Sequence, residues 1–241
     1  MTTPEQPVIV LVHGAFAESA SWNRVITRLH PEGLRVVAAG NPLRGLVSDG
    51  AYVRDIVNSV GGPVVLVGHS YGGMVVTQAA AGHPDVRALV YVGAFTPAQG
   101  ESALELSAKF EGSTLGEALV AYPVASGGDE VRIADDKYHH QFCADLDAAE
   151  AALMAVTQRP VTQQALTDGL DVGEEPWRTK PSWFVFGERD LNIPAEAVRF
   201  MAERADGRVI REVPGASHAI AASQPDVVAA TILDAVTATL H

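Results

Sequence analysis

The chain has 241 residues, of which 47% are hydrophobic and 19% charged, a composition that supplies a core for one domain and excludes bulk disorder. Its 17 Lys and Arg against 29 Asp and Glu give a formal net charge of −12, which disfavours nucleic acid as a partner. The single cysteine, Cys143, excludes an internal disulfide framework and a cysteine-based zinc site. No apolar run reaches the ~20 residues of a membrane span, and the N-terminal segment lacks a secretory-signal pattern, so we expect a cytoplasmic protein.

Short runs rich in β-branched residues are expected to form strands at 7–12, 35–39, 63–67, 88–93, 182–187 and 208–213. These runs are continuously apolar rather than alternating, which is typical of strands buried on both faces of a sheet. Helical patterns alternate with them at 21–29, 49–60, 72–81, 195–205 and 224–240. The alternation predicts right-handed crossovers and a doubly wound α/β fold with a mainly parallel sheet.

Residues 96–180 interrupt this alternation, because they are too many for a single crossover connection. Within them, 144–157 has a strongly helical pattern and 161–167 predicts another turn or two of helix. Glycines at 112, 116, 127 and 128 suggest mobile connections. We interpret 96–180 as a helical lid inserted into a single domain that spans residues 1–241, and not as an independent domain.

The strongest motif is GHSYG at 68–72, which directly follows the strand 63–67 and directly precedes the helix 72–81. This is the G-x-S-x-G pattern of a nucleophile elbow, in which a sharp turn strains the serine backbone and lifts its hydroxyl above the sheet. Gly68 and Gly72 remove side chains that would collide with neighbouring backbone. Ser70 is therefore predicted to be a nucleophile at the positive end of the following helix.

A serine nucleophile needs a general base, and the base needs an acid that orients it. His218 follows the last strand and Asp190 follows the strand 182–187, so the order Ser70, Asp190, His218 is the one that the elbow motif requires. All three follow the carboxyl ends of parallel strands, where open α/β sheets place their sites. Glu188 is the rival acid. Asp190 is preferred because it lies further into its loop, past the end of the strand. The other known position for the acid, after the fourth strand, is also disfavoured because residues 93–97 contain no carboxylate.

Two backbone N–H groups are predicted to stabilise the oxyanion that forms during acyl transfer. One belongs to Tyr71, the residue after the nucleophile, and the other to Ala15, in the loop HGAF at 13–16 that follows the first strand. His13 is interpreted as a brace of this loop rather than as a base.

Further residues that flank the catalytic positions are candidates for an apolar substrate pocket: Phe16, Phe95, Leu191 and Ala219. For Phe95, core packing is an equal alternative. The segment 135–145 holds two adjacent histidines, several carboxylates and Cys143, but adjacent histidines do not ligate a metal from one helix face. We interpret this segment as solvated lid surface, predict no metal site, and expect Cys143 to be buried against the sheet.

The segments VHGAF at 12–16, GHSYGG at 68–73, GERDLNIP at 187–194 and GASHA at 215–219 together resemble the α/β-hydrolase superfamily. The opening VHGAFAESASW is similar to the branch of small carboxylesterases, plant methyl-ester hydrolases and hydroxynitrile lyases. The resemblance implies a minimal six-stranded sheet flanked by helices, which begins at the strand that is usually third. It assigns Ser70, His218 and Asp190 to the triad, and Ala15 and Tyr71 to the oxyanion hole.

At two positions the sequence differs from some members of this superfamily, and each difference disfavours one of the reactions that those members catalyse. Ala219 stands where hydroxynitrile lyases carry a lysine, which disfavours lyase activity. Ser70 stands where epoxide hydrolases and haloalkane dehalogenases carry an aspartate, which disfavours alkyl-enzyme chemistry.

Together, these residues predict a serine hydrolase, a carboxylesterase without a cofactor, that cleaves a neutral or apolar small-molecule ester through an acyl-Ser70 intermediate. Two alternatives stay open. The same triad serves a perhydrolase or an acyltransferase, in which peroxide or an alcohol takes the acyl group. A ligand-binding sensor on a hydrolase scaffold would more often have lost a member of the triad, and here all three candidates are present. The acyl and alcohol groups and the oligomeric state stay open.

Overall fold

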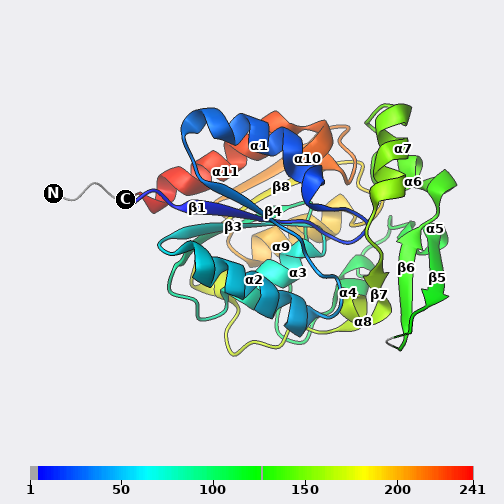
Figure 1. Cartoon of the computed structure of the whole chain (residues 1–241), viewed down its shortest axis with the longest axis horizontal. Helices are drawn as coiled ribbons and strands as arrows, with labels where there is room; N and C mark the ends of the chain where they lie inside the picture. Colours follow the sequence, from blue (N-terminus) through cyan, green and yellow to red (C-terminus); the bar gives the residue numbers. More distant parts are fainter. Residues whose placement is uncertain (1–4, 126, 241) are drawn as a thin grey trace.

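A six-stranded parallel sheet forms the centre of the computed structural model, which describes residues 5–125 and 127–240 (Figure 1). The strand order is β2-β1-β3-β4-β8-β9, and every neighbouring pair is parallel. The strands are β1 (Val8–Val12), β2 (Val36–Ala39), β3 (Val64–His69), β4 (Val86–Val92), β8 (Ser182–Gly187) and β9 (Val209–Val213). The predicted doubly wound α/β fold and its six strands are confirmed. The order reverses between β1 and β3, where such sheets bind their ligands beyond the strands' carboxyl ends.

Both faces of the sheet are buried, as the continuous apolar runs predicted. In β1, Val10 packs into the core on one face and Leu11 into the core on the other. The first face is covered by α2 (Leu46–Val60), α3 (Gly72–Ala80) and α9 (Ala195–Arg204). The second is covered by η1 (Ser19–Trp22), α1 (Asn23–Leu29), α10 (Ile220–Ser223) and α11 (Pro225–Thr239). A short turn of helix, η2 (His30–Glu32), leads from α1 towards β2.

The segment 96–180 lies mainly at one end of the sheet, beyond the carboxyl ends of the strands (Figure 1). Its helices are α4 (Ala103–Ser107), α5 (Leu115–Ala118), α6 (Asp135–Phe142), α7 (Ala148–Thr157), α8 (Gln163–Thr167) and η3 (Pro176–Arg178). It also contains an antiparallel sheet, which was not expected from the sequence and is formed by β5 (Leu119–Pro123), β6 (Asp129–Ile133) and β7 (Val161–Thr162). We call 96–180 the inserted segment.

A side-chain cap explains where helix α7 of the inserted segment begins. Helix α7 starts at Ala148 rather than at 144, because the Asp147 carboxylate accepts hydrogen bonds from the N–H groups of Ala149 and Glu150, at 3.0 Å each.

Within the described residues, no helix combines the length and the apolar character that crossing a bilayer needs.

Candidate active site

The predicted nucleophile Ser70 lies in a sharp turn between β3 and α3. Its φ is +55°, a left-handed conformation that costs a non-glycine residue about 1–3 kcal/mol and is found mainly at functional sites. The flanking glycines permit this turn. A Cβ at Gly68 would lie 2.5 Å from the carbonyl oxygen of Gly72, and a Cβ at Gly72 would lie 2.4 Å from that of Val12. The motif therefore folds as the strained strand–turn–helix that its spacing predicted.

The predicted acid and base are in direct contact. Nδ1 of His218 donates a hydrogen bond to Oδ2 of Asp190 at 2.6 Å, and both side chains are almost fully buried. The other carboxylate oxygen of Asp190 accepts from the backbone N–H groups of Asn192 and Ile193, at 2.8 and 2.9 Å. A proton held on Nδ1 leaves Nε2 as the basic nitrogen, and Nε2 has no hydrogen-bond partner among the described residues.

The end of β4 lies against the same carboxylate. Gly93 follows β4 with a φ of +48°, and a Cβ built on it would lie 3.7 Å from Oδ2 of Asp190. The rival acid Glu188 is exposed, and its carboxylate accepts a hydrogen bond from the N–H of Gly215 at 2.8 Å. Glu188 thus shapes the loop that leads to His218, while Asp190 binds the imidazole itself.

The His218 loop is attached to the turn that holds Ser70. His69, the residue before Ser70, is buried, and its Nε2 lies 2.9 Å from the backbone carbonyl oxygen of His218. The two imidazole rings lie 4.8 Å apart, centroid to centroid. The imidazole of His218 is therefore beside the elbow, although its Nε2 is not hydrogen-bonded to the Ser70 hydroxyl in this structure. Catalytic hydrogen bonds are often formed only when substrate binds.

The loop after β1 passes close to Ser70. A Cβ at Gly14 would lie 2.5 Å from Cβ of Ser70. His13 stabilises the loop: its Nε2 accepts a hydrogen bond from the N–H of Asn41 at 3.0 Å, and its Nδ1 lies 2.9 Å from the carbonyl oxygen of Gly14. Burial lowers the pKa of His13 to about 4, so the ring is neutral at pH 7 and acts as the brace that was expected. The N–H of Phe16 is already bonded, because it donates to the carbonyl of Arg159 at 3.1 Å. The N–H of Ala15 is therefore the candidate oxyanion donor of this loop.

The other candidate donor, Tyr71, is fixed by a buried carboxylate that sequence reasoning missed. Its hydroxyl donates to Oδ2 of Asp49 at 3.0 Å, and Asp49 also accepts from the N–H of Arg44 at 3.0 Å. Burial raises the pKa of Asp49. The sequence predicted a helix over 49–60 but assigned no role to the Asp49 side chain.

A cavity of about 100 Å³ opens beside Ser70, and none of the described residues that line it is charged. Phe16 and Phe95 line it, as proposed from the sequence, whereas Leu191 and Ala219 lie outside its lining. The inserted segment supplies most of the apolar wall, which the sequence could not place: Ala103, Leu104, Leu115, Leu119 and Leu166.

The segment 135–145 does not lie wholly at the surface. The expectation of a solvated segment is wrong for Tyr138, which is fully buried on α6. Cys143 is buried, as expected, and burial raises the pKa of its thiol to about 12, so it is a poor nucleophile at neutral pH. In the part of the chain that the structure describes, no three His, Cys, Asp or Glu side chains are grouped to hold a metal ion.

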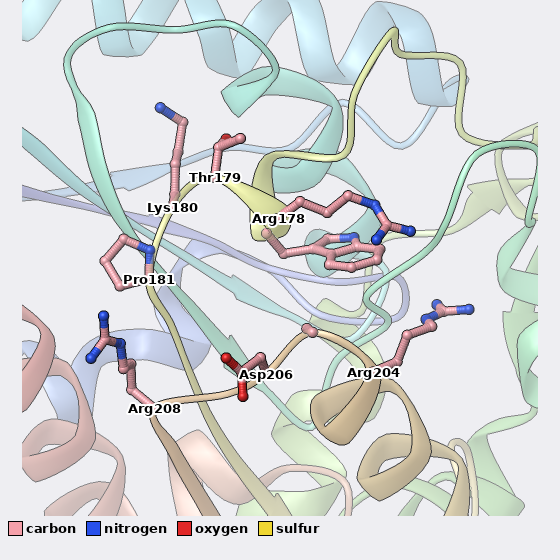
Figure 2. Close-up of a pocket in the computed structure, with 9 residues that line it drawn as sticks. Arg178, Thr179, Lys180, Pro181, Arg204, Asp206 and Arg208 are labelled. Carbon is pink, nitrogen blue, oxygen red and sulfur yellow. The ribbon is translucent and has the colours of Figure 1, made fainter.

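A larger cavity, of about 370 Å³, lies away from these residues at the amino end of β8 (Figure 2). Its lining includes four cationic side chains: Arg178, Lys180, Arg204 and Arg208. Figure 2 shows their charged ends pointing in different directions rather than towards one centre. Arg178 pairs with Glu175 at 2.7 Å and Arg204 with Glu101 at 2.8 Å, so two of the charges are already neutralised. Size alone therefore does not make this cavity the active site.

The chain is similar in sequence to known hydrolases over most of its length. A sequence profile described as the alpha/beta hydrolase family matches residues 9–231. The chain is similar to Esterase PIR7B of Oryza sativa subsp. japonica, with 27% identity over 246 residues that cover 90% of each protein. It is also similar to a carbendazim hydrolyzing esterase of Nocardioides sp. (strain SG-4G), with 34% identity over 113 residues, 42% of this chain and 47% of the relative.

The crystal structure of polyneuridine aldehyde esterase is similar in fold. The TM-score is 0.81 at 20% sequence identity, and the match covers 95% of this chain and 99% of that one. The likeness supports the arrangement of strands and helices around Ser70.

Proposed function

This chain belongs to the alpha/beta hydrolase family, and from that premise we propose that it cleaves carboxylic esters through an acyl-Ser70 intermediate. The observation that carries the proposal is the buried pair of His218 and Asp190 beside the strained turn of Ser70. The names of the relatives support the same reaction class, since two of them are esterases.

In the proposed mechanism, Nε2 of His218 takes the proton of the Ser70 hydroxyl while Oγ attacks the ester carbonyl. The N–H groups of Ala15 and Tyr71 bind the oxyanion, each stabilising the transition state by about 2.7–4 kcal/mol. His218 then gives its proton to the leaving alkoxide, so that an alcohol departs and acyl-Ser70 remains. Water, deprotonated by His218, attacks the acyl carbon and releases the carboxylic acid and Ser70. Asp190 stabilises the imidazolium at both stages without itself taking a proton.

The size and the lining of the cavity beside Ser70 favour a small, uncharged substrate. Its volume of about 100 Å³ is below the roughly 300–1,000 Å³ of ordinary ligand pockets. Ser113 lines the cavity, but its hydroxyl already donates a hydrogen bond to the carbonyl of Asn192 at 3.0 Å and is not free to donate to a substrate. An apolar wall with no free charge favours a short acyl or alkoxy group over an anionic one.

Hydrolysis of p-nitrophenyl acetate and butyrate by the wild type and by Ser70→Ala tests the proposal. We expect wild-type turnover and none in Ser70→Ala, whereas Ser59→Ala, which removes an exposed hydroxyl of α2 bonded to the carbonyl of Ile56, keeps full activity. A fluorophosphonate probe is expected to label the peptide that contains Ser70 and no other. Equal activity in the wild type and Ser70→Ala would refute the proposal, and products formed with added peroxide or alcohol identify the acyl acceptor.

A further inference from the structure

Phe16, which follows the candidate oxyanion donor Ala15, has a strained backbone. Its φ is +61°, a conformation that a residue with a bulky side chain adopts only when its surroundings impose it. Phe16 is buried and lines the cavity beside Ser70. Because Phe16 directly follows Ala15, the contacts that hold Phe16 in this conformation also fix the loop that carries the Ala15 amide.

Two hydrogen bonds hold Phe16, and both partners come from the inserted segment. The N–H of Phe16 donates to the carbonyl of Arg159 at 3.1 Å, and its carbonyl accepts from the hydroxyl of Tyr138 at 2.7 Å. Tyr138 is fully buried on α6, and burial holds its pKa well above the usual value, so the hydroxyl keeps its proton and remains a donor.

The same helix contacts the base one turn further on. The ring of Phe142 stacks on that of Tyr138, with centroids 4.9 Å apart, and meets the imidazole of His218 edge-on, also at 4.9 Å. The carbonyl of Phe142 accepts a hydrogen bond from the N–H of Ala219 at 2.9 Å. Helix α6 thus contacts both the loop of the candidate oxyanion donor and the loop of the candidate base.

We infer that Tyr138 is a positioning residue of the proposed esterase: its hydroxyl holds the loop 13–16 so that the Ala15 N–H faces the oxyanion formed at Ser70. The inference rests on the proposed function. Without the hydroxyl, the Phe16 carbonyl loses its buried donor and the strained loop relaxes. Because an oxyanion donor acts on charge that develops in the transition state, the loss falls on kcat rather than on KM.

The test compares Tyr138→Phe with Tyr91→Phe as a matched control. Tyr91 is also fully buried, stacks on Phe184 at 5.0 Å, and has its hydroxyl 2.9 Å from that of Thr77, but it lies within β4 rather than on α6. Each substitution removes one buried hydroxyl and keeps the ring. We expect kcat for p-nitrophenyl esters to fall about 10- to 100-fold in Tyr138→Phe with KM little changed, and to stay near wild type in Tyr91→Phe.

Amide hydrogen exchange of the peptide 11–18 gives a second measurement that needs no activity. We expect faster exchange in Tyr138→Phe and unchanged exchange in Tyr91→Phe. Unchanged exchange in Tyr138→Phe, or faster exchange with an unchanged kcat, would overturn the inference. A wild type without esterase activity would refute the proposed function instead, and the exchange result would still decide whether Tyr138 holds the loop. If Tyr138→Phe does not fold, exchange of the peptide 11–18 is compared between Phe16→Gly, in which glycine adopts this φ without strain, and Phe16→Gly combined with Tyr138→Phe. Faster exchange in the double variant supports the inference, and equal exchange in the two overturns it.

Discussion

Nε2 of His69 donates a hydrogen bond to the backbone carbonyl oxygen of His218 at 2.9 Å, which ties two residues of distant sequence together beside Ser70. A carbonyl oxygen only accepts, so Nε2 must carry the proton. Burial, helped by the neighbouring His218, lowers the pKa of His69 to about 3, and the ring stays neutral at every pH at which an esterase is assayed. His69 is therefore a tether for the loop that carries the candidate base His218, and is not itself a candidate base.

Replacing His69 with leucine is expected to lower kcat about 10- to 100-fold, because the loop that carries His218 loses its attachment to the elbow. The matched control is His83→Leu, which removes a hydrogen bond between Nε2 and Oδ1 of Asn58 far from the site. Steady-state kinetics with p-nitrophenyl butyrate and thermal unfolding check both variants. Equal kcat values in the two would contradict the tether.

Asp190→Asn is expected to lower kcat by about 10⁴-fold, since an amide at this position favours the wrong tautomer of the base. Glu188→Gln is the control, because its amide oxygen can still accept from the N–H of Gly215. Its activity should stay close to that of the wild type. Inactivation by Glu188→Gln, with Asp190→Asn active, would transfer the role of the acid to Glu188.

Gly14→Ala is expected to abolish activity and lower the melting temperature, because the new Cβ would lie 2.5 Å from Cβ of Ser70 and 2.7 Å from the carbonyl oxygen of His69. The backbone on either side must then move. Gly173→Ala, where a Cβ meets no atom within 4 Å, should leave both properties unchanged. Kinetics and calorimetry on the pair decide whether the close approach of the loop to Ser70 matters.

Acid is expected to destabilise the fold through two buried histidines. His13 and His69 have pKa values lowered to about 4 and about 3, whereas in the unfolded chain they titrate near 6.5. Below pH 6.5 the unfolded chain therefore binds protons that the folded chain does not. The free energy of unfolding falls between pH 6.5 and 4, by up to about 1.4 kcal/mol per pH unit for each histidine.

Urea unfolding at a series of pH values from 7.5 to 4.5 measures this slope. His13→Asn is expected to give a shallower pH dependence than the wild type, because one of the two titrating rings is gone. Parallel curves for the two proteins would show that His13 does not contribute.

The sheet and most of the candidate site could be predicted because their signals are local. The apolar runs at β1, β3 and β8 indicate burial on both faces, and the glycines around Ser70 indicate a turn in which no Cβ fits. Asp190 and His218 needed one further inference, that the carboxyl ends of parallel strands share one edge of the sheet.

The inserted segment could not be predicted in the same way. Strand β7 has only two residues, and its pairing with β6 depends on how the segment folds back. Tyr138 stands among charged and histidine neighbours, so its surroundings in the sequence suggested a solvated surface. The available signal was its i, i+4 spacing to Phe142, which puts both rings on one face of a helix.

A Cβ on Gly93 would lie 3.7 Å from Oδ2 of Asp190, in ordinary van der Waals contact, and this has a consequence for where the proposed triad can carry its acid. Strands β4 and β8 are hydrogen-bonded neighbours, and Gly93, which follows β4, lies against the carboxylate of Asp190, which follows β8. Aspartate tolerates the left-handed backbone found at Gly93 better than most residues do. An acidic side chain placed directly after β4 would therefore lie beside the present position of the Asp190 carboxylate, with the candidate nucleophile Ser70 and the candidate base His218 unchanged.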